Sequence, residues 1–330
     1  MKFKLKYFII ILFFSICLFS IYDLYFTNQS FTVENRQIIN NGIIQNLKIY
    51  SPKNRGKYPG IVFGAGSGAQ KSLYNHFAQS FAKNGFVVLL RNRRSGHKKI
   101  KTWDDSKIDY INCVNYLKSL DNVDSNNILI GGHSANANIA YRVSLQKNDE
   151  IKGLIAIAGR FPPKNFKQKT NIFLSTGSND KLVKPEKIFE IARKIKKETI
   201  VTNKVLGDFN KRNALYIYID QDSNHLTEIW SSKIINRSLL FSFKSINKDI
   251  TTLKKVYKFN FFNELAKLVI GIFIFYLLLK INCFKKIYLE RYCYRIFYLI
   301  SIFLILFLTF KITISNNFID LGPFYYNYKR

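Results

Sequence analysis

Short apolar runs alternate with longer helical stretches through the middle of the chain, from residue 59 to residue 243. Strands that are separated by helices tend to pair in parallel, and the helices then cover both faces of the sheet. The alternation therefore predicts an α/β fold with a mostly parallel sheet. The predicted strands are 59–63, 86–90, 127–130, 151–157, 171–175 and 214–219, and the predicted helices are 73–84, 103–120, 135–146, 184–197 and 226–243.

An antiparallel hairpin is expected ahead of this region. Residues 31–50 contain two strand-like runs on either side of Asn41-Gly42. This dipeptide favours a type I′ turn because both of its residues tolerate a positive φ. The sheet should therefore begin with two antiparallel strands.

Three apolar segments flank the predicted α/β region, from Tyr7 to Phe26, from Leu265 to Phe284 and from Ile296 to Ile314. Each has about 20 residues, enough for a helix that crosses a bilayer. The first follows three lysines and lacks a small-residue cleavage site, so we expect an uncleaved signal anchor rather than a cleaved signal peptide. Lys267 and Lys280 interrupt the second, which leaves an interfacial helix as its alternative.

The segments predict three parts: an N-terminal signal anchor or transmembrane helix at 1–30, an α/β domain at 31–250 and a C-terminal membrane region with two hydrophobic helices at 260–330. The loop at 280–295 and the extreme N-terminus are both rich in Lys and Arg. The positive-inside rule places both in the cytoplasm. We therefore expect the α/β domain on the extracytoplasmic side of a membrane.

The formal net charge is +30, from 51 Lys and Arg against 21 Asp and Glu. Such an excess raises the question of a nucleic-acid partner, but the basic residues are spread along the chain without a basic arm, so none is expected. A solvated Lys-rich surface and attraction to anionic lipids fit better. The four cysteines lack CxxC or zinc-finger spacing, so we expect no disulfide framework, no metal site and no cofactor.

Ser134 lies in the sequence Gly132-His-Ser-Ala-Asn136, between a predicted strand and a predicted helix. This is the context of a nucleophile elbow, in which a tight turn exposes the serine hydroxyl and small neighbours let strand and helix approach. Asn136 stands where a second small residue is usual. His133, next to the serine, is expected to point away from the site.

Two further residues follow later strands. Asp180 comes after the strand at 171–175, and His225 comes after the strand at 214–219. A carboxylate in such a turn can orient a histidine that acts as general base, although a turn or capping aspartate is the plainer interpretation. His225 is the one of the four histidines whose position suits that base. The predicted catalytic residues are therefore Ser134, Asp180 and His225.

The order serine, aspartate, histidine, each after a strand, resembles the α/β-hydrolase superfamily, over about residues 30 to 246. The stretches from Gly56 to Gly68 and from Phe81 to Leu89 are similar to small dienelactone-hydrolase-like and acyl-esterase-like members. The resemblance implies an oxyanion loop at Gly64 to Gly68, with the backbone amides of Ser67 and Ala135 as the donors. Ala65 stands where that family usually has a histidine.

The expected function is that of a membrane-anchored serine hydrolase, which cleaves a small-molecule or lipid ester or thioester through an acyl-enzyme intermediate. A peptidase or an acyltransferase could use the same three residues. Asn136 and Ala65 also leave open a membrane scaffold that keeps the fold without catalysis, since a fold does not by itself determine function.

Overall fold

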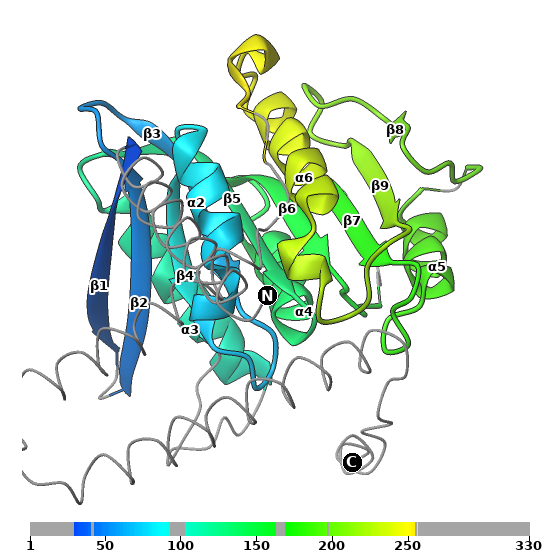
Figure 1. Ribbon diagram of the computed structural model, residues 1–330, viewed down its shortest axis with the longest axis horizontal. Helices are drawn as coiled ribbons and strands as arrows, with labels where there is room; N and C mark the ends of the chain where they lie inside the picture. Colours follow the sequence, from blue (N-terminus) through cyan, green and yellow to red (C-terminus); the bar gives the residue numbers. More distant parts are fainter. Residues whose placement is uncertain are drawn as a thin grey trace, which may run out of the picture. The chain divides into compact units, whose positions relative to one another are not determined.

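The computed structural model of the protein describes residues 30–40, 43–92, 103–162, 169–196, 198–254 and 256. They build a nine-stranded sheet with the order β1-β2-β4-β3-β5-β6-β7-β9-β8 (Figure 1). The six strands from β4 to β9 in that order are parallel to one another, whereas β1, β2 and β8 pair antiparallel. The strands are β1 Phe31–Asn40, β2 Ile43–Pro52, β3 Tyr58–Gly64, β4 Val87–Arg91, β5 Val123–His133, β6 Ile151–Ile157, β7 Asn171–Gly177, β8 Val205–Leu206 and β9 Leu215–Asp220.

Helices cover both faces of the sheet. One apolar cluster joins the sheet to α3, α4 and α5, and a second joins it to α2 and α6. Figure 1 shows α2 and α6 in front of the strands. The helices are α2 Asn75–Lys83, α3 Trp103–Lys118, α4 Ala135–Gln146, α5 Pro185–Ile195 and α6 Ser232–Ser245, with short 3₁₀ turns η2 Lys71–Tyr74, η3 Glu228–Trp230 and η4 Ile250–Thr252.

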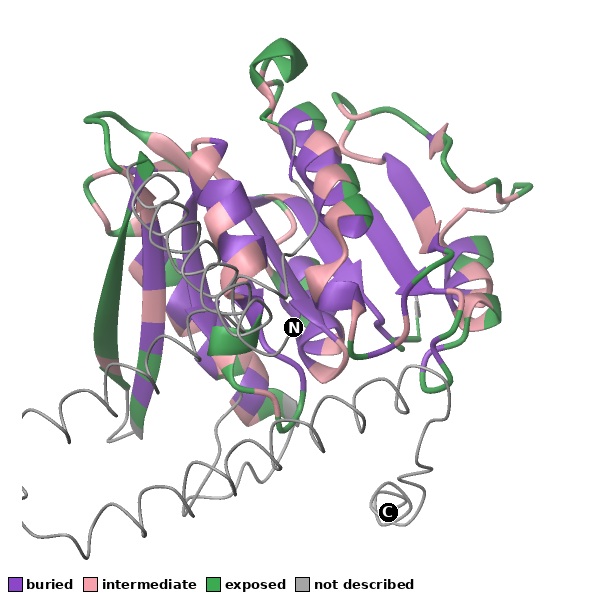
Figure 2. Ribbon diagram, in the orientation of Figure 1, coloured by how far each residue is buried: buried purple, intermediate pink, exposed green. Residues whose placement is uncertain are grey.

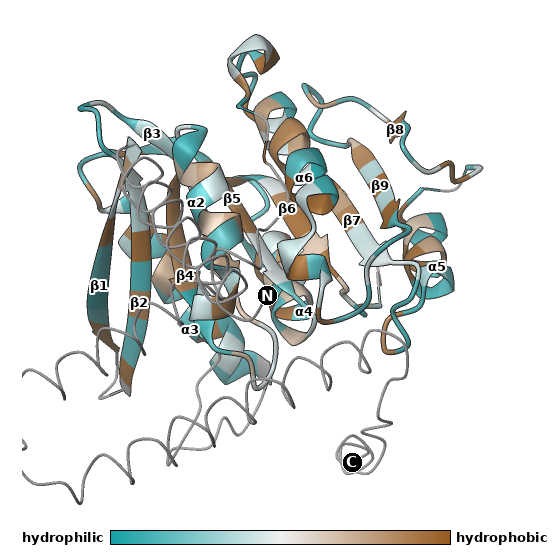
Figure 3. Ribbon diagram, in the orientation of Figure 1, coloured by the Kyte–Doolittle hydropathy of each residue, from teal (hydrophilic) through white to brown (hydrophobic). Residues whose placement is uncertain are grey.

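Burial follows from this layering. Every residue of β7 is buried, because β6 and β9 flank it and helices cover both of its faces. The edge strand β1 is mostly exposed and carries four consecutive polar residues at 34–37. Figure 2 shows the buried centre of the sheet, and Figure 3 shows that the same central strands are the most hydrophobic part. Continuous apolar runs therefore mark the inner parallel strands, as expected for a sheet buried on both sides.

The strand order reverses beside β3. The chain passes from β3 to β4 on one side and then returns to place β5 on the other side of β3. In open α/β sheets such a reversal opens a crevice at the carboxyl ends of the two strands, where ligands bind. The loop after β3 and the turn after β5 both end at this crevice, and these are the segments that hold Gly66 and Ser134.

The predicted mostly parallel α/β sheet and the antiparallel hairpin are confirmed. The last helix begins at Ser232 instead of residue 226, because the Ser231 side chain accepts a hydrogen bond from the backbone N–H of Ile234 and caps the helix there. The two-residue strand β8 was not predicted, since two residues show no periodicity.

Within the described residues, no helix combines the length and the apolar character that a bilayer crossing requires. The apolar segments at 7–26, 265–284 and 296–314 and the turn dipeptide at 41–42 lie outside the described residues. The membrane anchor, the C-terminal membrane region and the side of the membrane therefore stay predictions.

Candidate active site

Ser134 occupies a strained turn between β5 and α4. Its φ of 54° and ψ of −120° lie in a region that residues other than glycine rarely adopt. Its backbone N–H donates to the carbonyl of Ile157, at 2.9 Å, which ties the turn to β6. A Cβ atom on Gly132 would lie 2.6 Å from the backbone of Asn136, so only glycine fits there. The local geometry is that of a nucleophile elbow.

Asp180 and His225 are brought together from two different turns. Nδ1 of His225 lies 2.8 Å from Oδ2 of Asp180, and both residues are buried. Oδ1 of Asp180 accepts the backbone N–H groups of Leu182 and Val183, at 2.7 and 2.8 Å. Burial raises the pKa of Asp180, but the hydrogen bond and charge of His225 outweigh it and lower the pKa to about 2. The aspartate is therefore ionised, and it holds the proton of His225 on Nδ1.

The remaining nitrogen of His225, Nε2, is left to act as a base. In the described part of the chain, the Ser134 hydroxyl and His225 form no hydrogen bond with each other. The ring of His133, which precedes Ser134, lies 4.7 Å from the ring of His225 between centroids. Catalytic hydrogen bonds often tighten only when substrate is bound. Attack by Ser134 would require its hydroxyl to form that hydrogen bond.

The two predicted oxyanion donors lie on either side of the crevice. Ser67 is in the exposed turn after β3, and Ala135 is the first residue of α4, where backbone N–H groups have no partner inside the helix. The amide of Gly66 is already engaged, because it donates to the Tyr74 hydroxyl at 2.8 Å. The bond to Tyr74 fixes the loop next to Ser67.

Asn136 does not crowd the elbow. Its side chain is fully buried, its Oδ1 accepts from Nη1 of Arg91 at 3.0 Å, and its Nδ2 donates to the carbonyl of Ala65. A Cβ atom on Gly64 would lie 2.6 Å from Cβ of Asn136, so the glycine supplies the space that the asparagine occupies. Asn136, where a small residue is usual, thus ties the elbow to the loop after β3.

Arg91, at the end of β4, was not identified from the sequence. Arg91 is 1% exposed, and the central carbon of its guanidinium lies 5.0 Å from the ring centre of Tyr110. An arginine after the apolar run of β4 gives the sequence pattern of a strand that ends at the surface, so no local signal marks it as buried.

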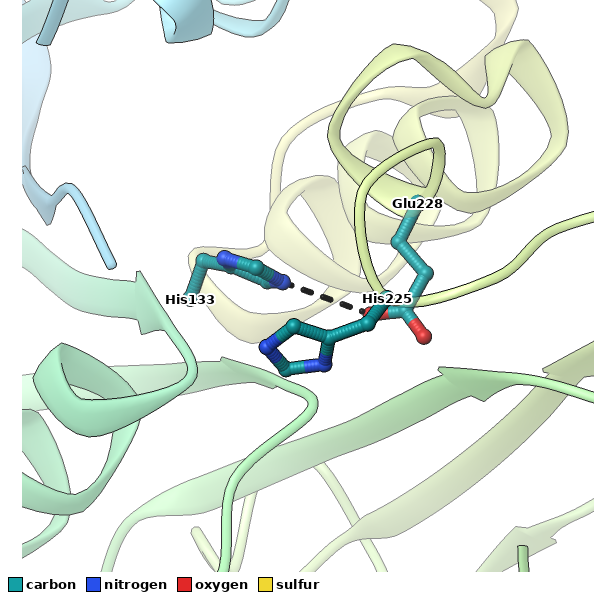
Figure 4. Close-up of side chains that lie close together, drawn as sticks. All are labelled: His133, His225 and Glu228. Atoms are coloured by element: carbon teal, nitrogen blue, oxygen red, sulfur yellow. Dashed lines mark ion pairs between the residues drawn. The ribbon is translucent and has the colours of Figure 1, made fainter. Parts of the chain in front are cut away.

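The prediction that His133 points away from the site is wrong. Its ring is buried beside that of His225 (Figure 4). Nδ1 of His133 lies 3.0 Å from the Tyr74 hydroxyl. Nε2 lies 3.5 Å from Oε2 of Glu228. Burial, followed by the neighbouring His225, lowers the pKa of His133 to about 3, so the ring is neutral. The side chain of the last residue of β5 faces the segment that carries His225, a contact visible only in three dimensions.

The hydrogen bonds assign the tautomer of His133. The amide of Gly66 can only donate, so the Tyr74 oxygen accepts from it and the single Tyr74 O–H is free to donate. Tyr74 is buried, and Nδ1 of His133 is its one available acceptor among the described residues. Nδ1 therefore accepts, and the proton of the neutral ring is on Nε2, which faces Glu228.

Glu228 is a second residue that sequence reasoning missed. It is fully buried, and its Oε1 accepts from the backbone N–H of Gly177 at 2.7 Å and lies 3.0 Å from Oγ1 of Thr176. Burial and the charge of Asp180 raise its pKa well above the ordinary value. The signal available in the sequence was its spacing, three residues after His225 at the start of η3.

His133, His225 and Glu228 each place one ligand atom within 4.8 Å of the others (Figure 4). Two imidazoles and a carboxylate form a donor set that suits zinc. However, the Tyr74 hydroxyl donates to Nδ1 of His133, so the Nε2 nitrogen of His133 that faces Glu228 carries the proton of the neutral ring. The cluster is thus arranged for hydrogen bonding, and we assign it no metal.

Residues 60–208 match the family described as Alpha/beta hydrolase family. The fold is similar to that of Est1E from Butyrivibrio proteoclasticus, with a TM-score of 0.51 and 15% identity, over 65% of this chain and 99% of that chain. It is also similar to a structure described as a dienelactone hydrolase from Klebsiella pneumoniae subsp. pneumoniae MGH 78578, with a TM-score of 0.51 and 10% identity, over 67% of this chain and 100% of that chain.

Esterase Est22 is similar with a TM-score of 0.50 and 15% identity, over 66% of this chain and 80% of that chain. No protein of curated function matches this sequence. At these identities the structural likeness shows the fold and nothing beyond it. The described part of the chain therefore has the α/β-hydrolase fold, and residues 60–208 match the alpha/beta hydrolase family.

Proposed function

We propose that this protein is a serine hydrolase that cleaves an ester or thioester, with Ser134 as nucleophile, His225 as general base and Asp180 as the residue that orients His225. The observation that carries the proposal is the 2.8 Å hydrogen bond from His225 to a buried, ionised Asp180 at the same crevice edge as an elbow serine. An orienting carboxylate of this kind is what a histidine base requires.

The mechanism proceeds in two steps. Oγ of Ser134 bonds to the substrate carbonyl carbon while Nε2 of His225 takes its proton, and the backbone amides of Ser67 and Ala135 stabilise the negative oxygen. The intermediate expels the alcohol or thiol, which leaves with the proton from His225. Water then attacks the acyl-serine, gives a proton to His225 and releases the acid, and the proton returns to Ser134.

The test is covalent labelling of the full-length, detergent-solubilised protein with a fluorophosphonate probe. Wild type should be labelled, and Ser134→Ala should abolish labelling, because the probe reacts with an activated serine. Ser72→Ala, which removes an exposed serine outside the site, should label like wild type. A folded wild-type protein that takes no label would sink the enzyme proposal and favour a binding or scaffolding role.

The same protein is proposed to sit in a membrane through the apolar segments at 7–26, 265–284 and 296–314, with its hydrolase domain on the extracytoplasmic side. The support is the length of the segments and the basic residues around them. A membrane-bound hydrolase has ready access to lipid esters, and short-chain and long-chain acyl esters offered to the purified protein would test that substrate class.

A further inference from the structure

The hydroxyl of Thr176 lies among three oxygen atoms that ordinarily accept hydrogen bonds. Its Oγ1 is 2.8 Å from the carbonyl of Val183, 3.1 Å from Oδ2 of Asp180 and 3.0 Å from Oε1 of Glu228. A threonine hydroxyl has one proton and can accept two hydrogen bonds. If both carboxyl groups were ionised, one proton would have to serve three acceptors in a buried site. At least one further proton is therefore needed for a second of these three contacts to be a hydrogen bond.

The extra proton belongs on Glu228 rather than on Asp180. The carboxylate of Asp180 receives three hydrogen bonds, two from backbone N–H groups and one from His225. Glu228 receives one from the backbone, from Gly177. Hydrogen bonds to a carboxylate favour its ionised form, so the better-supplied Asp180 keeps the charge.

No cation compensates Glu228 among the described residues. The titratable groups that face it are Asp180 from the turn after β7, His133 from β5, His225 from the turn after β9 and Tyr74 from η2. Asp180 is negative, and the other three are neutral or, for His225, bound to Asp180. An isolated carboxylate in a buried site is costly, which favours the neutral acid.

We propose that Glu228 stays protonated in the resting enzyme and acts as a positioning residue for Asp180, by supplying the hydrogen bond that the oxygen cluster around Thr176 lacks. This inference rests on the proposed function, because it concerns the orienting acid of that site. The Glu228 O–H donates to Thr176 Oγ1, whose own proton then serves Val183 or Asp180. Oε2 lies 3.5 Å from Nε2 of His133, the nitrogen that carries the proton of that ring.

A neutral Glu228 also favours the neutral form of His225, which is the form that acts as a base. A second carboxylate beside His225 would stabilise the imidazolium relative to the neutral imidazole that the proposed base requires. His133, with Nε2 at 3.5 Å from Oε2 of Glu228, is linked in turn through the Tyr74 hydroxyl to the amide of Gly66 in the loop after β3. Glu228 thus contacts Thr176 beside Asp180 on one side and His133 on the other.

The first test is the pH profile of fluorophosphonate labelling for wild type, Glu228→Gln and Glu228→Ala. Glutamine is neutral like the protonated acid, so the acid limb of its profile should keep the wild-type midpoint, with a labelling rate within about tenfold of wild type. Alanine should lose more, because Gly177 and Thr176 lose their partner. Glu186→Gln, on an exposed part of α5, is the matched control. A midpoint in Glu228→Gln that moves down by about one pH unit or more would show that Glu228 is ionised in wild type and overturn the inference.

The second test needs no catalysis. The infrared difference spectrum of wild type minus Glu228→Gln at neutral pH should contain the C=O stretch of a protonated carboxylic acid. Carboxylate bands in its place would overturn the inference. This readout decides the state of Glu228 even if wild type takes no fluorophosphonate label, so failure of the proposed function and failure of the inference give different results.

Discussion

Asn136 illustrates how one residue can look unfavourable in a motif and be favourable in the fold. In the sequence it replaces a small residue at the elbow. In the structure its amide joins Arg91 to the carbonyl of Ala65, and Gly64 makes room for it. The Asn136 side chain supplies an acceptor to Arg91, because a buried guanidinium must have hydrogen-bond acceptors.

At this scale we predict that Asn136→Gly, which restores the usual small residue, destabilises the protein. The change leaves a buried arginine without its acceptor, which should lower the free energy of unfolding by about 3 kcal/mol. Thermal unfolding of the detergent-solubilised protein would measure it. Gln146→Gly, at the exposed last residue of the same helix, should cost at most about 1 kcal/mol. Equal losses in the two variants would contradict the role of Asn136.

The elements around the site are positioned by close approach of backbones. The carboxyl end of β5 meets the first turn of α4 at Gly132, and the turn after β7 meets that after β9 at Gly177, where a Cβ atom would lie 2.1 Å from the carbonyl oxygen of Ser223. The close contact at Gly132 positions Ser134, and the close contact at Gly177 positions Asp180 next to His225. The geometry of the site therefore depends on the turns that follow β5, β7 and β9.

Gly132→Ala should abolish fluorophosphonate labelling and destabilise the fold by about 3 kcal/mol or more, because the new Cβ would meet backbone atoms that cannot turn away. In Gly60→Ala, on β3, the nearest atom is Cδ2 of Leu117 at 2.9 Å, a flexible side chain. This control should keep its label. Labelling intensity and thermal unfolding of the two variants check the prediction, and a labelled Gly132→Ala would contradict the elbow geometry.

For the whole molecule, the buried Glu228 makes stability depend on pH. Its pKa is raised well above 4.5 in the folded state, whereas the unfolded chain releases the proton near that value. The contribution of Glu228 to the free energy of unfolding is thus fully present below about pH 4.5. It is lost as pH rises toward the folded pKa, at up to about 1.4 kcal/mol per pH unit. Glu228→Gln should therefore gain stability relative to wild type between pH 5 and pH 8. Thermal unfolding over that range tests it, and a constant difference between the two proteins would refute it.

Asp180 also makes stability depend on pH, but with the opposite sign and at lower pH. Its pKa falls from 3.8 to about 2 on folding, so its contribution is present above pH 3.8 and is lost as pH falls toward 2. The two carboxyl groups therefore affect different pH ranges, and the comparison above pH 5 isolates Glu228.

The membrane proposal also belongs to the whole molecule. In native membranes the full chain should resist extraction with alkaline carbonate, because helices of about 20 apolar residues stay in the bilayer. Protease added from the extracytoplasmic side should digest the hydrolase domain. Release of the chain by carbonate would argue against the anchor, and protection of the domain would argue against its placement.

The sequence by itself determined the succession of elements. Strands buried on both faces are continuous apolar runs, and the elbow serine, Asp180 and His225 each follow such a run at the carboxyl end of a strand. Those signals are local, because periodicity and strand ends are written in adjacent residues. The predicted α/β-hydrolase fold and the meeting of Asp180 with His225 follow from them, whereas their catalytic roles await the labelling experiment.

Only the tertiary structure decided the roles of Arg91, Asn136, His133 and Glu228. Each is a polar residue whose burial depends on partners far away in the chain, such as Ala65 for Asn136 and Thr176 for Glu228. A polar residue in a turn usually remains in water, so its sequence neighbours do not indicate that it is buried. Close packing of the strand ends removes water from these groups, and they must then find hydrogen-bond partners in each other.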